Sequence, residues 1–314
     1  MIIAVTGLNT AAEPEAGFGV LQSLQGMRNR DCRLIGFAYK ELETGLFHPG
    51  LMDRAFIVPL PRSNSGAFLH RIRQIKMEAG LDIIIPTIGE EIDVFADMEN
   101  EFREMGVKTL LPDRQGLREM QLKVDKKLKT TKKAPAEDEG AYTVIPSSLT
   151  KNPVAERVVP AGRVNPDLFA VALIADRKSK IVALAAVKKI LISRYGGTWM
   201  ALTVECSEFR GLAEKLIRNT AWRGPLTVEI IEDGKGKPSI TGIRPVFPDW
   251  ISLAGAAGAN LPVILIDILQ GKDFKGVVQT APGKVLVRAA LDVVTNLNQF
   301  GDISLSGEFN YDHK

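Results

Sequence analysis

The acidic side chain that is the strongest candidate for a functional role is Glu229, which lies on a predicted β-hairpin. Its neighbours Val228 and Ile230 are apolar, and alternation along a strand turns Glu229 away from them, toward a cleft or water. The second strand of the hairpin, residues 240–244, ends in Arg244. A carboxylate can bind a divalent cation or pair with an arginine. Pairing of Glu229 with Arg244 across the hairpin is the preferred interpretation.

Two polar segments follow predicted buried strands in the N-terminal part of the chain. Asn9 comes after the first apolar run, and Glu90 and Glu91 come after the run at residues 82–86. Ligands of open parallel sheets bind beyond the carboxyl ends of the strands, so these side chains can face a substrate. Alternatively, Gly7 only makes a tight turn and Glu90 only caps the next helix. The sequence leaves both interpretations open.

These side chains depend on two kinds of predicted sheet. Up to residue 127, short apolar strands alternate with helices, a pattern typical of a parallel, doubly wound sheet. After residue 153, strands at 168–175 and 181–187 surround a short turn, which indicates an antiparallel sheet. The first part has predicted strands over 2–6, 33–37, 82–86 and 107–111, and helices over 17–27, 69–77, 92–105 and 114–127. Later helices are predicted over 208–221, 251–258 and 262–269, and the tail over 283–297 starts as a strand and continues as a helix.

A composition break separates the two parts. Residues 123–142 carry lysine repeats followed by an acidic run and hold few apolar side chains. Such a segment cannot bury a core of its own and is predicted to be a solvated linker or mobile loop. The predicted organisation is therefore a first domain at 1–127, a linker or reduced lid at 128–153, and a second domain with the tail at 154–314.

Bulk composition excludes several classes of protein. The chain has 314 residues, of which 45% are hydrophobic and 25% charged, as in ordinary globular proteins. Its formal net charge of +3 is too small to indicate a nucleic-acid or anionic-membrane partner. Asn260 and Pro262 interrupt the apolar stretch 251–266, so no membrane span is predicted. The two cysteines and three histidines lack zinc spacing, and reduced thiols in a cytoplasmic protein are expected.

The hairpin resembles the closing hairpin of the ATP-grasp superfamily, close to its carbamoyl-phosphate-synthetase-like branch. The shared frame is Trp222-Arg-Gly-Pro-Leu-Thr-Val-Glu229, a Gly-containing turn, a second apolar strand and Pro245-Val-Phe-Pro248. The resemblance implies an α/β, Rossmann-like pre-ATP-grasp domain at 1–127. It also implies an α+β ATP-grasp domain with an antiparallel sheet, which is incomplete because too few residues remain for the family's first grasp subdomain.

The resemblance also assigns roles to individual residues. In the family, the second strand reads roughly Glu-Ile-Asn-Pro-Arg, and its Glu and Asn hold magnesium on the nucleotide phosphates. Gly242 and Arg244 stand at those two positions here, while Glu229 matches the family's first magnesium carboxylate. Glu229 is therefore expected to bind metal only if ATP is bound. Glu156 matches a hinge acid that meets adenosine, and Lys188 matches a basic residue at a strand end.

Plain alternatives exist for these matches. Glu156 can be a surface glutamate, and Lys188 can be a solvated strand end. Asn9, Glu90 and Glu91 match the acceptor-substrate side of the pre-ATP-grasp domain, where Arg244 is also placed.

Three functions fit these observations. The favoured one is a degenerate ATP-grasp protein without a cofactor. It would act as a non-catalytic subunit or binding module in a homo- or hetero-oligomer, in the second case with an active ATP-grasp protein. No nucleic-acid or membrane partner is expected. The alternative is a divergent ATP-dependent carboxylate–amine or carboxylate–thiol ligase, which would use ATP and Mg²⁺, form an acylphosphate and have residues 128–153 as its lid. The third is a small-molecule sensor that uses only the N-terminal cleft.

Overall fold

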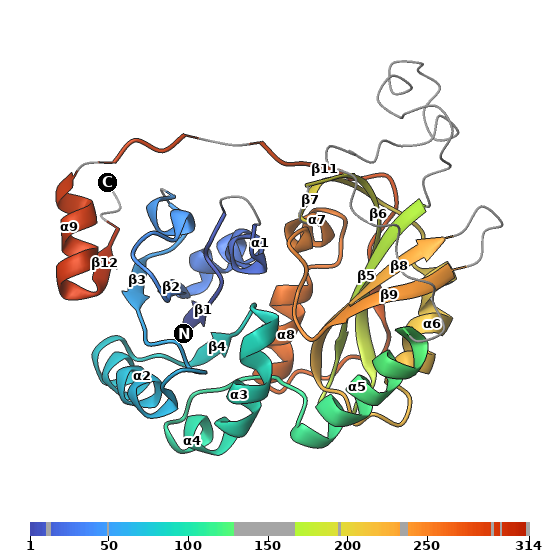
Figure 1. The fold of residues 1–314 in the computed structure, drawn as a ribbon, viewed down its shortest axis with the longest axis horizontal. Coiled ribbons are helices and arrows are strands. Elements are labelled where there is room, and N and C mark those ends of the chain that lie inside the picture. The colour runs from blue at the N-terminus through green and yellow to red at the C-terminus, as the bar shows by residue number, and fades with distance from the viewer. Residues whose placement is uncertain are drawn as a thin grey trace.

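The computed structural model describes residues 1–10, 14–48, 50–128, 167–193, 196–232, 238–289, 292–295 and 297–311. Two sheets lie side by side, with helices between them and on their outer faces (Figure 1). The predicted α/β plus α+β fold class is confirmed by the parallel and antiparallel sheets. The predicted linker at 128–153 lies outside the described residues, except for Leu128.

The first sheet, sheet A, has the strand order β12-β3-β2-β1-β4. Its strands are β1 (Ile2–Val5), β2 (Arg33–Ala38), β3 (Arg54–Ile57), β4 (Ile83–Ile85) and β12 (Glu308–Asn310). The first four are parallel, as predicted from apolar runs buried on both faces. Neither β3 nor β12 is predicted from the sequence. The predicted strand at 107–111 is wrong, because only an isolated bridge joins Lys108 to Ile83.

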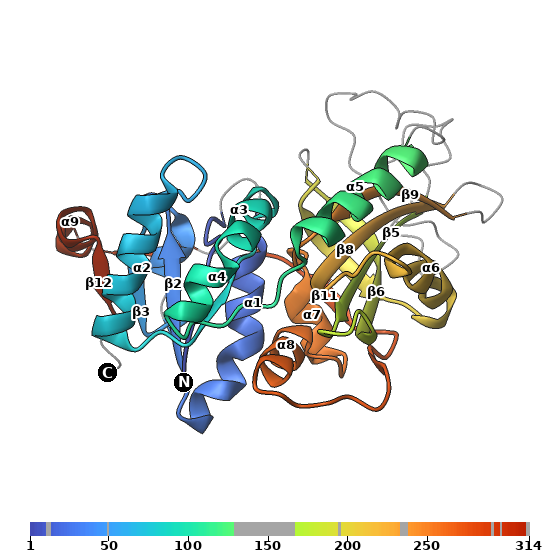
Figure 2. The same ribbon diagram turned by 90° about the horizontal axis from the view of Figure 1, so that it is seen from below.

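Helices flank sheet A on both faces (Figure 2). They are α1 (Ala16–Leu24), α2 (Ser65–Ala79), α3 (Ile92–Asp97) and α4 (Glu99–Glu104). The side chain of Asn64 accepts the N–H of Ala67 at the start of α2, and Gly80 ends that helix with a φ of 79°. The single helix predicted over 92–105 is broken at Met98, which separates α3 from α4.

The second sheet, sheet B, has seven strands in the order β11-β7-β6-β5-β8-β9, with β10 pairing to β6. The strands are β5 (Asp167–Ala175), β6 (Ile181–Ile192), β7 (Thr198–Thr203), β8 (Gly224–Glu232), β9 (Pro238–Arg244), β10 (Val278–Gln279) and β11 (Val285–Val287). Its helices are α5 (Arg114–Leu128), α6 (Ser207–Ile217), α7 (Ile251–Ala256) and α8 (Leu261–Leu269). The predicted hairpin is formed by β8 and β9.

Alternation divides sheet B into two packed faces. Val171, Leu173, Val228 and Ile230 pack under α5 and α6, which cover one face (Figure 2). The intervening small residues, Ala170 and Ala172 among them, join a core that also contains side chains from α7, α8 and α1. Small side chains on this face let the helices approach the strands closely.

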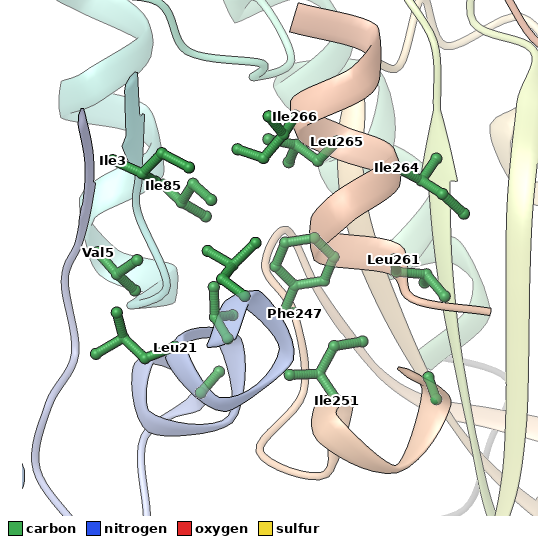
Figure 3. Packing of buried hydrophobic residues seen from close by; sticks show 14 of the residues in the cluster. Ile3, Val5, Leu21, Ile85, Phe247, Ile251, Leu261, Ile264, Leu265 and Ile266 are labelled. Carbon is green, nitrogen blue, oxygen red and sulfur yellow. The ribbon is translucent and has the colours of Figure 1, made fainter. Parts of the chain in front are cut away.

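One hydrophobic core reaches from sheet A to sheet B. In Figure 3, Ile3, Val5 and Ile85 of sheet A and Leu21 of α1 face Phe247 and the residues of α7 and α8. Phe247 is 1% exposed, and Leu261, Leu265 and Ile266 of α8 are buried as well. The two sheets are therefore held together by a shared apolar core. Burial of apolar surface contributes about 25 cal/mol of stabilising free energy for each Å² removed from water.

The C-terminal part of the chain returns to sheet A. After β11 it runs past residues 292–295 to α9 (Leu297–Ser306) and β12, beside β3 (Figure 1). The helix predicted directly after β11 is wrong for 292–295, which have no regular structure. Glu308 of β12 bonds to Arg71 Nη2 at 2.8 Å and to Arg54 Nη2 at 3.2 Å. Residues 308–310, counted above with the second domain, thus belong to the sheet of the first.

Gly224 sets the contact between the two parts at the start of β8. Its φ is +88°, and a Cβ built on it would lie 2.3 Å from the carbonyl oxygen of Leu110. A side chain is therefore excluded both by backbone conformation and by space.

We expect Gly224→Ala to lower the free energy of unfolding by at least about 2 kcal/mol, because strain and a backbone clash add. Gly211→Ala is the matched control. Gly211 lies inside α6 with no atom within 4 Å of a Cβ, so the same change there should raise stability by about 0.5–1 kcal/mol. Chemical denaturation of both variants measures this, and equal effects would contradict the close contact.

Candidate functional site

A cavity of about 660 Å³ lies between the carboxyl ends of β1 and β4 and the facing side of sheet B. We call it the central cavity. Its charged and amide side chains are Asn9, Glu15 and Glu90 from the sheet A side and Lys189, Glu229, Arg244 and Asp249 from the sheet B side. The structure thus brings together Asn9, Glu90, Glu229 and Arg244, which are predicted from the sequence. Glu156 lies outside the described residues.

Three charged side chains form an ion cluster on the sheet B wall. Glu229 Oε1 accepts from Arg244 Nη2 at 2.6 Å, and Glu229 Oε2 lies 2.8 Å from Lys189 Nζ. The predicted pairing of Glu229 with Arg244 is therefore confirmed. The side chains of Lys189, Glu229 and Arg244 are 6%, 21% and 51% exposed, so the cluster runs from a buried ammonium to a solvated guanidinium. Both oxygens of Glu229 are thus engaged by cations.

The register of the hairpin produces this cluster. Glu229 lies directly opposite Gly242, and Arg244 lies opposite Thr227, one pleat further along. A Cβ built on Gly242 would lie 3.5 Å from Cβ and Cγ of Glu229, an ordinary van der Waals contact. Position 242 therefore has room for a side chain beside Glu229.

Lys188, the basic residue singled out in the sequence, points to the other face of sheet B. Its Nζ lies 5.6 Å from the centroid of the Phe169 ring, its register partner on β5. The next residue, Lys189, lies on the cavity face and binds Glu229. Both lysines lie inside β6, which runs to Ile192, and Lys188 is 5% exposed, so the interpretation of Lys188 as a solvated strand end is wrong. A shift of one residue along a strand reverses the face, which is why Lys189 and not Lys188 reaches the cavity.

Glu91 is buried beside the cavity and does not line it. It is 3% exposed and accepts hydrogen bonds from Thr6 Oγ1 at 2.8 Å and from Tyr39 Oη at 2.5 Å. Burial raises the pKa of the Glu91 carboxyl to about 8; the two hydrogen bonds lower it, and the nearby Glu15 and Glu43 raise it. Its exposed neighbour Glu90 lines the cavity. Within the segment 89–91, Glu91 therefore belongs to the buried hydrogen-bond network and Glu90 to the cavity wall.

Two further glutamates near the site, Glu15 in the cavity lining and Glu43 outside it, were not singled out in the sequence. Glu15 Oε2 accepts the backbone N–H of Asn9 at 3.0 Å, and burial raises the pKa of Glu15 to about 7. Glu43 Oε1 accepts the backbone N–H of Tyr39 at 2.7 Å, and burial raises the pKa of Glu43 as well. Both carboxylates hold the turn after β1 in place. The only sequence signal for them is their place shortly after predicted strands.

Gly7 makes the turn that brings these groups together. Its φ is +71°, and a Cβ built on it would lie 2.3 Å from Thr87 Oγ1. Thr87 Oγ1 donates to the carbonyl of Thr6 at 2.7 Å, so β1 and β4 are tied together just beyond their last paired residues. The interpretation of Gly7 as a tight turn is therefore sufficient for its conformation.

The described lining of the cavity therefore has an acidic side on sheet A and paired charges of both signs on sheet B, without a set of oxygen ligands for a metal ion. Within the described ranges, no three His, Cys, Asp or Glu side chains are grouped so that they could hold an ion. A hard divalent cation requires several oxygen ligands, and Glu229 already bonds to two positive side chains. These residues do not fit a magnesium site of the kind implied by the resemblance.

We expect Glu229→Gln to lower the free energy of unfolding by about 3 kcal/mol, because it leaves the buried Lys189 ammonium without its counter-ion. Arg244→Ala is the control. It removes an exposed partner of the same carboxylate and should cost less than about 1 kcal/mol. Urea denaturation measures both, and an arginine change as costly as the glutamate change would show that the buried pair does not dominate.

The raised pKa of Glu91 makes stability depend on pH. Because its pKa is higher folded than unfolded, its contribution is fully present below the unfolded value of 4.5 and is lost as the pH rises through about 8. Between about pH 5 and pH 8 we expect stability to fall by up to about 1.4 kcal/mol per pH unit. Glu91→Gln should flatten this slope, because the amide is neutral throughout.

Tyr39→Phe should extend the fall to higher pH, because it removes a hydrogen bond that lowers the pKa of Glu91. Denaturant titrations at a series of pH values test both variants. A wild-type slope retained in Glu91→Gln would assign the pH dependence to other groups, Glu15 first among them.

Comparisons with known proteins place this architecture. No family model and no curated protein matches the sequence. Among the described helices, none is long and apolar enough to cross a membrane. Solved structures do match, at 10–14% sequence identity and with TM-scores between 0.53 and 0.57.

Three solved structures illustrate the likeness. Biotin carboxylase from Campylobacter jejuni, in a β,γ-ATP complex, has 12% identity and a TM-score of 0.55; the match covers 87% of this chain and 72% of that one. L-amino acid ligase from Bacillus licheniformis has 10% identity and a TM-score of 0.53, with 87% and 75% covered. A complete multifunctional pyruvate carboxylase from Rhizobium etli has 11% identity and a TM-score of 0.54, and this chain spans only 24% of it. Together with the two-sheet topology and the hairpin, these matches show that the chain has the ATP-grasp fold.

Proposed function

We propose that this protein is a non-catalytic binding module built on the ATP-grasp fold. The observation that supports this most is the ion cluster, in which Lys189 and Arg244 bind both oxygens of Glu229. A magnesium ion at Glu229 would lie next to two positive charges, and the repulsion would offset the attraction of one carboxylate. The scaffold is retained while the ligand set for a metal–nucleotide complex is not, so fold and function separate here.

The proposal includes a partner. This chain spans 28% of a single-chain, multi-domain long-chain acyl-CoA carboxylase and 24% of the multifunctional pyruvate carboxylase. In those proteins the same fold works beside other domains. We propose that the present chain likewise acts in a homo- or hetero-oligomer, in the second case with an active ATP-grasp protein. The oligomer would be cytoplasmic and would not bind nucleic acid. Light scattering of the purified protein over a range of concentrations tests the homo-oligomer.

An ATP-dependent ligase is the second candidate, and the retained central cavity favours it. The cavity lies between the strand ends of sheet A and the sheet B wall that carries the ion cluster. Lys189 and Arg244 would neutralise phosphate oxygens there. The carboxylate of a substrate would take the terminal phosphoryl group of ATP and release ADP, and an amine or thiol would then displace phosphate from the acylphosphate. Asn9 and Glu90, at the strand ends, would face the acceptor.

Thermal unfolding with ATP, with and without MgCl₂, separates the two candidates. A ligand at 100 times its Kd stabilises the folded state by about 2.7 kcal/mol, so tight binding of magnesium–ATP would raise Tm clearly. We expect no magnesium-dependent rise for the unmodified protein. A magnesium-dependent rise together with ADP formation from a carboxylate and an amine would establish the ligase and contradict our proposal.

The double variant Gly242→Glu, Arg244→Asn is the positive control. It places a second carboxylate and an amide next to Glu229, where the hairpin has room for them. Since hard cations prefer such oxygen ligands, we expect this variant to gain a magnesium-dependent rise in Tm. Arg244→Asn alone adds no second carboxylate and should gain little. If neither variant responds while both stay folded, the ion cluster is not what prevents metal binding.

A further inference from the structure

A second cavity, of about 380 Å³, lies on the other side of the junction between the two sheets, and we call it the basic cavity. Arg103 and Lys108 line it from the N-terminal part, and Arg177 and Arg223 line it from the sheet B part. Glu99 is the one acidic side chain in its lining. The excess of three positive charges equals the net charge of the whole chain, +3, so the basic cavity concentrates positive charge on an otherwise balanced protein.

The walls of the basic cavity are fixed by the fold. Gly224 brings the start of β8 against the carbonyl of Leu110, which places Arg223 next to the segment 107–111. Arg177 sits in the tight turn between β5 and β6, where Asp176 Oδ1 accepts the N–H groups of Lys178 and Lys180 at 2.8 and 2.9 Å. These bonds fix the backbone of the turn, and Arg177 itself is exposed.

Among the described residues, the cations of the basic cavity are only partly neutralised. Arg223 Nη2 lies 3.3 Å from Glu99 Oε2, a long contact to a carboxylate that is 42% exposed. The side chains of Arg103 and Lys108 donate hydrogen bonds to neutral oxygens. Arg103 bonds to Asn100 at 2.6 Å, and Lys108 bonds to the carbonyl of Leu269 at 3.4 Å. Guanidinium groups with spare N–H donors bind phosphate oxygens in bidentate geometry.

The rest of the lining is mostly apolar, with Thr109 as its one polar side chain. Val107, Leu110 and Leu111 form part of the wall, and the volume exceeds what a lone phosphate needs. Small-molecule sites combine such an apolar wall with a few placed charges and often lie between domains. We propose that the basic cavity binds an organic phosphate, whose phosphate group contacts the arginines and whose carbon part packs on the apolar wall. This site is independent of the central cavity and of the function proposed for it.

Isothermal titration calorimetry of the whole chain tests the proposal, with phenyl phosphate, inorganic phosphate and citrate as probes. Phenyl phosphate should bind, inorganic phosphate should bind more weakly because it lacks the apolar part, and citrate should bind weakest. Raising the salt concentration should weaken all binding to these partly exposed cations. No heat with phenyl phosphate, or tighter binding of citrate, would overturn the proposal.

Variants locate the site. Arg177→Ala should weaken phenyl phosphate about tenfold, the loss expected for one charge-assisted bidentate contact. Lys178→Ala is its matched control, because it removes the same charge from the neighbouring exposed residue of the same turn, outside the cavity lining. Arg103→Ala should weaken binding as well, and Arg244→Ala in the central cavity should not. Equal losses in Arg177→Ala and Lys178→Ala, or a loss confined to Arg244→Ala, would overturn the assignment.

Discussion

The shared core between the two sheets is the interaction on which the rest of the structure depends. Phe247 follows the hairpin directly and inserts between α1 and α8, so the strand that carries Arg244 leads into the packing that joins sheet A to sheet B. Because close-packed interiors resist deformation, the distance between the strand ends of sheet A and the ion cluster is set by this core. The central cavity therefore exists because apolar side chains elsewhere hold its walls apart.

Charge compensation inside the cavity follows from two positions on one strand. A glycine at 242 leaves space beside Glu229, and an arginine at 244, one pleat further along, brings a positive charge to the same carboxylate. Lys189 of β6 adds a second cation to the same carboxylate. The carboxylate is thus satisfied internally, as a partly buried charge must be. On the sheet A side, Glu15 in the cavity lining and the buried Glu91 beside the cavity accept hydrogen bonds from backbone and hydroxyl donors and have raised pKa values. On both sides of the cavity, these carboxyl groups are therefore bound by other groups of the protein itself.

Local patterns predicted much of the fold and part of the site. The hairpin, α5, α8 and the parallel strands β1, β2 and β4 follow from periodicity and turns within a few residues. Glu229 and Arg244 were predicted as partners because they lie close together on the two strands of one hairpin. Lys189 was missed because residues 181–190 of β6 are all buried, so the sequence carries no alternation that tells one face from the other. β12 was missed because its pairing with β3 joins residues about 250 positions apart and has no local signature.

The return of the chain to sheet A bears on the order of folding. Strand β3 has one neighbour, β2, until residues 308–310 have been synthesised and can pair with its other edge. Ile303 of α9 is buried, and Glu308 supplies the carboxylate for Arg54 and Arg71, so those groups also wait until residue 308 has been synthesised. A nascent chain therefore carries an open edge on β3 until residues 308–310 emerge, a state in which unpaired strands are prone to join other chains.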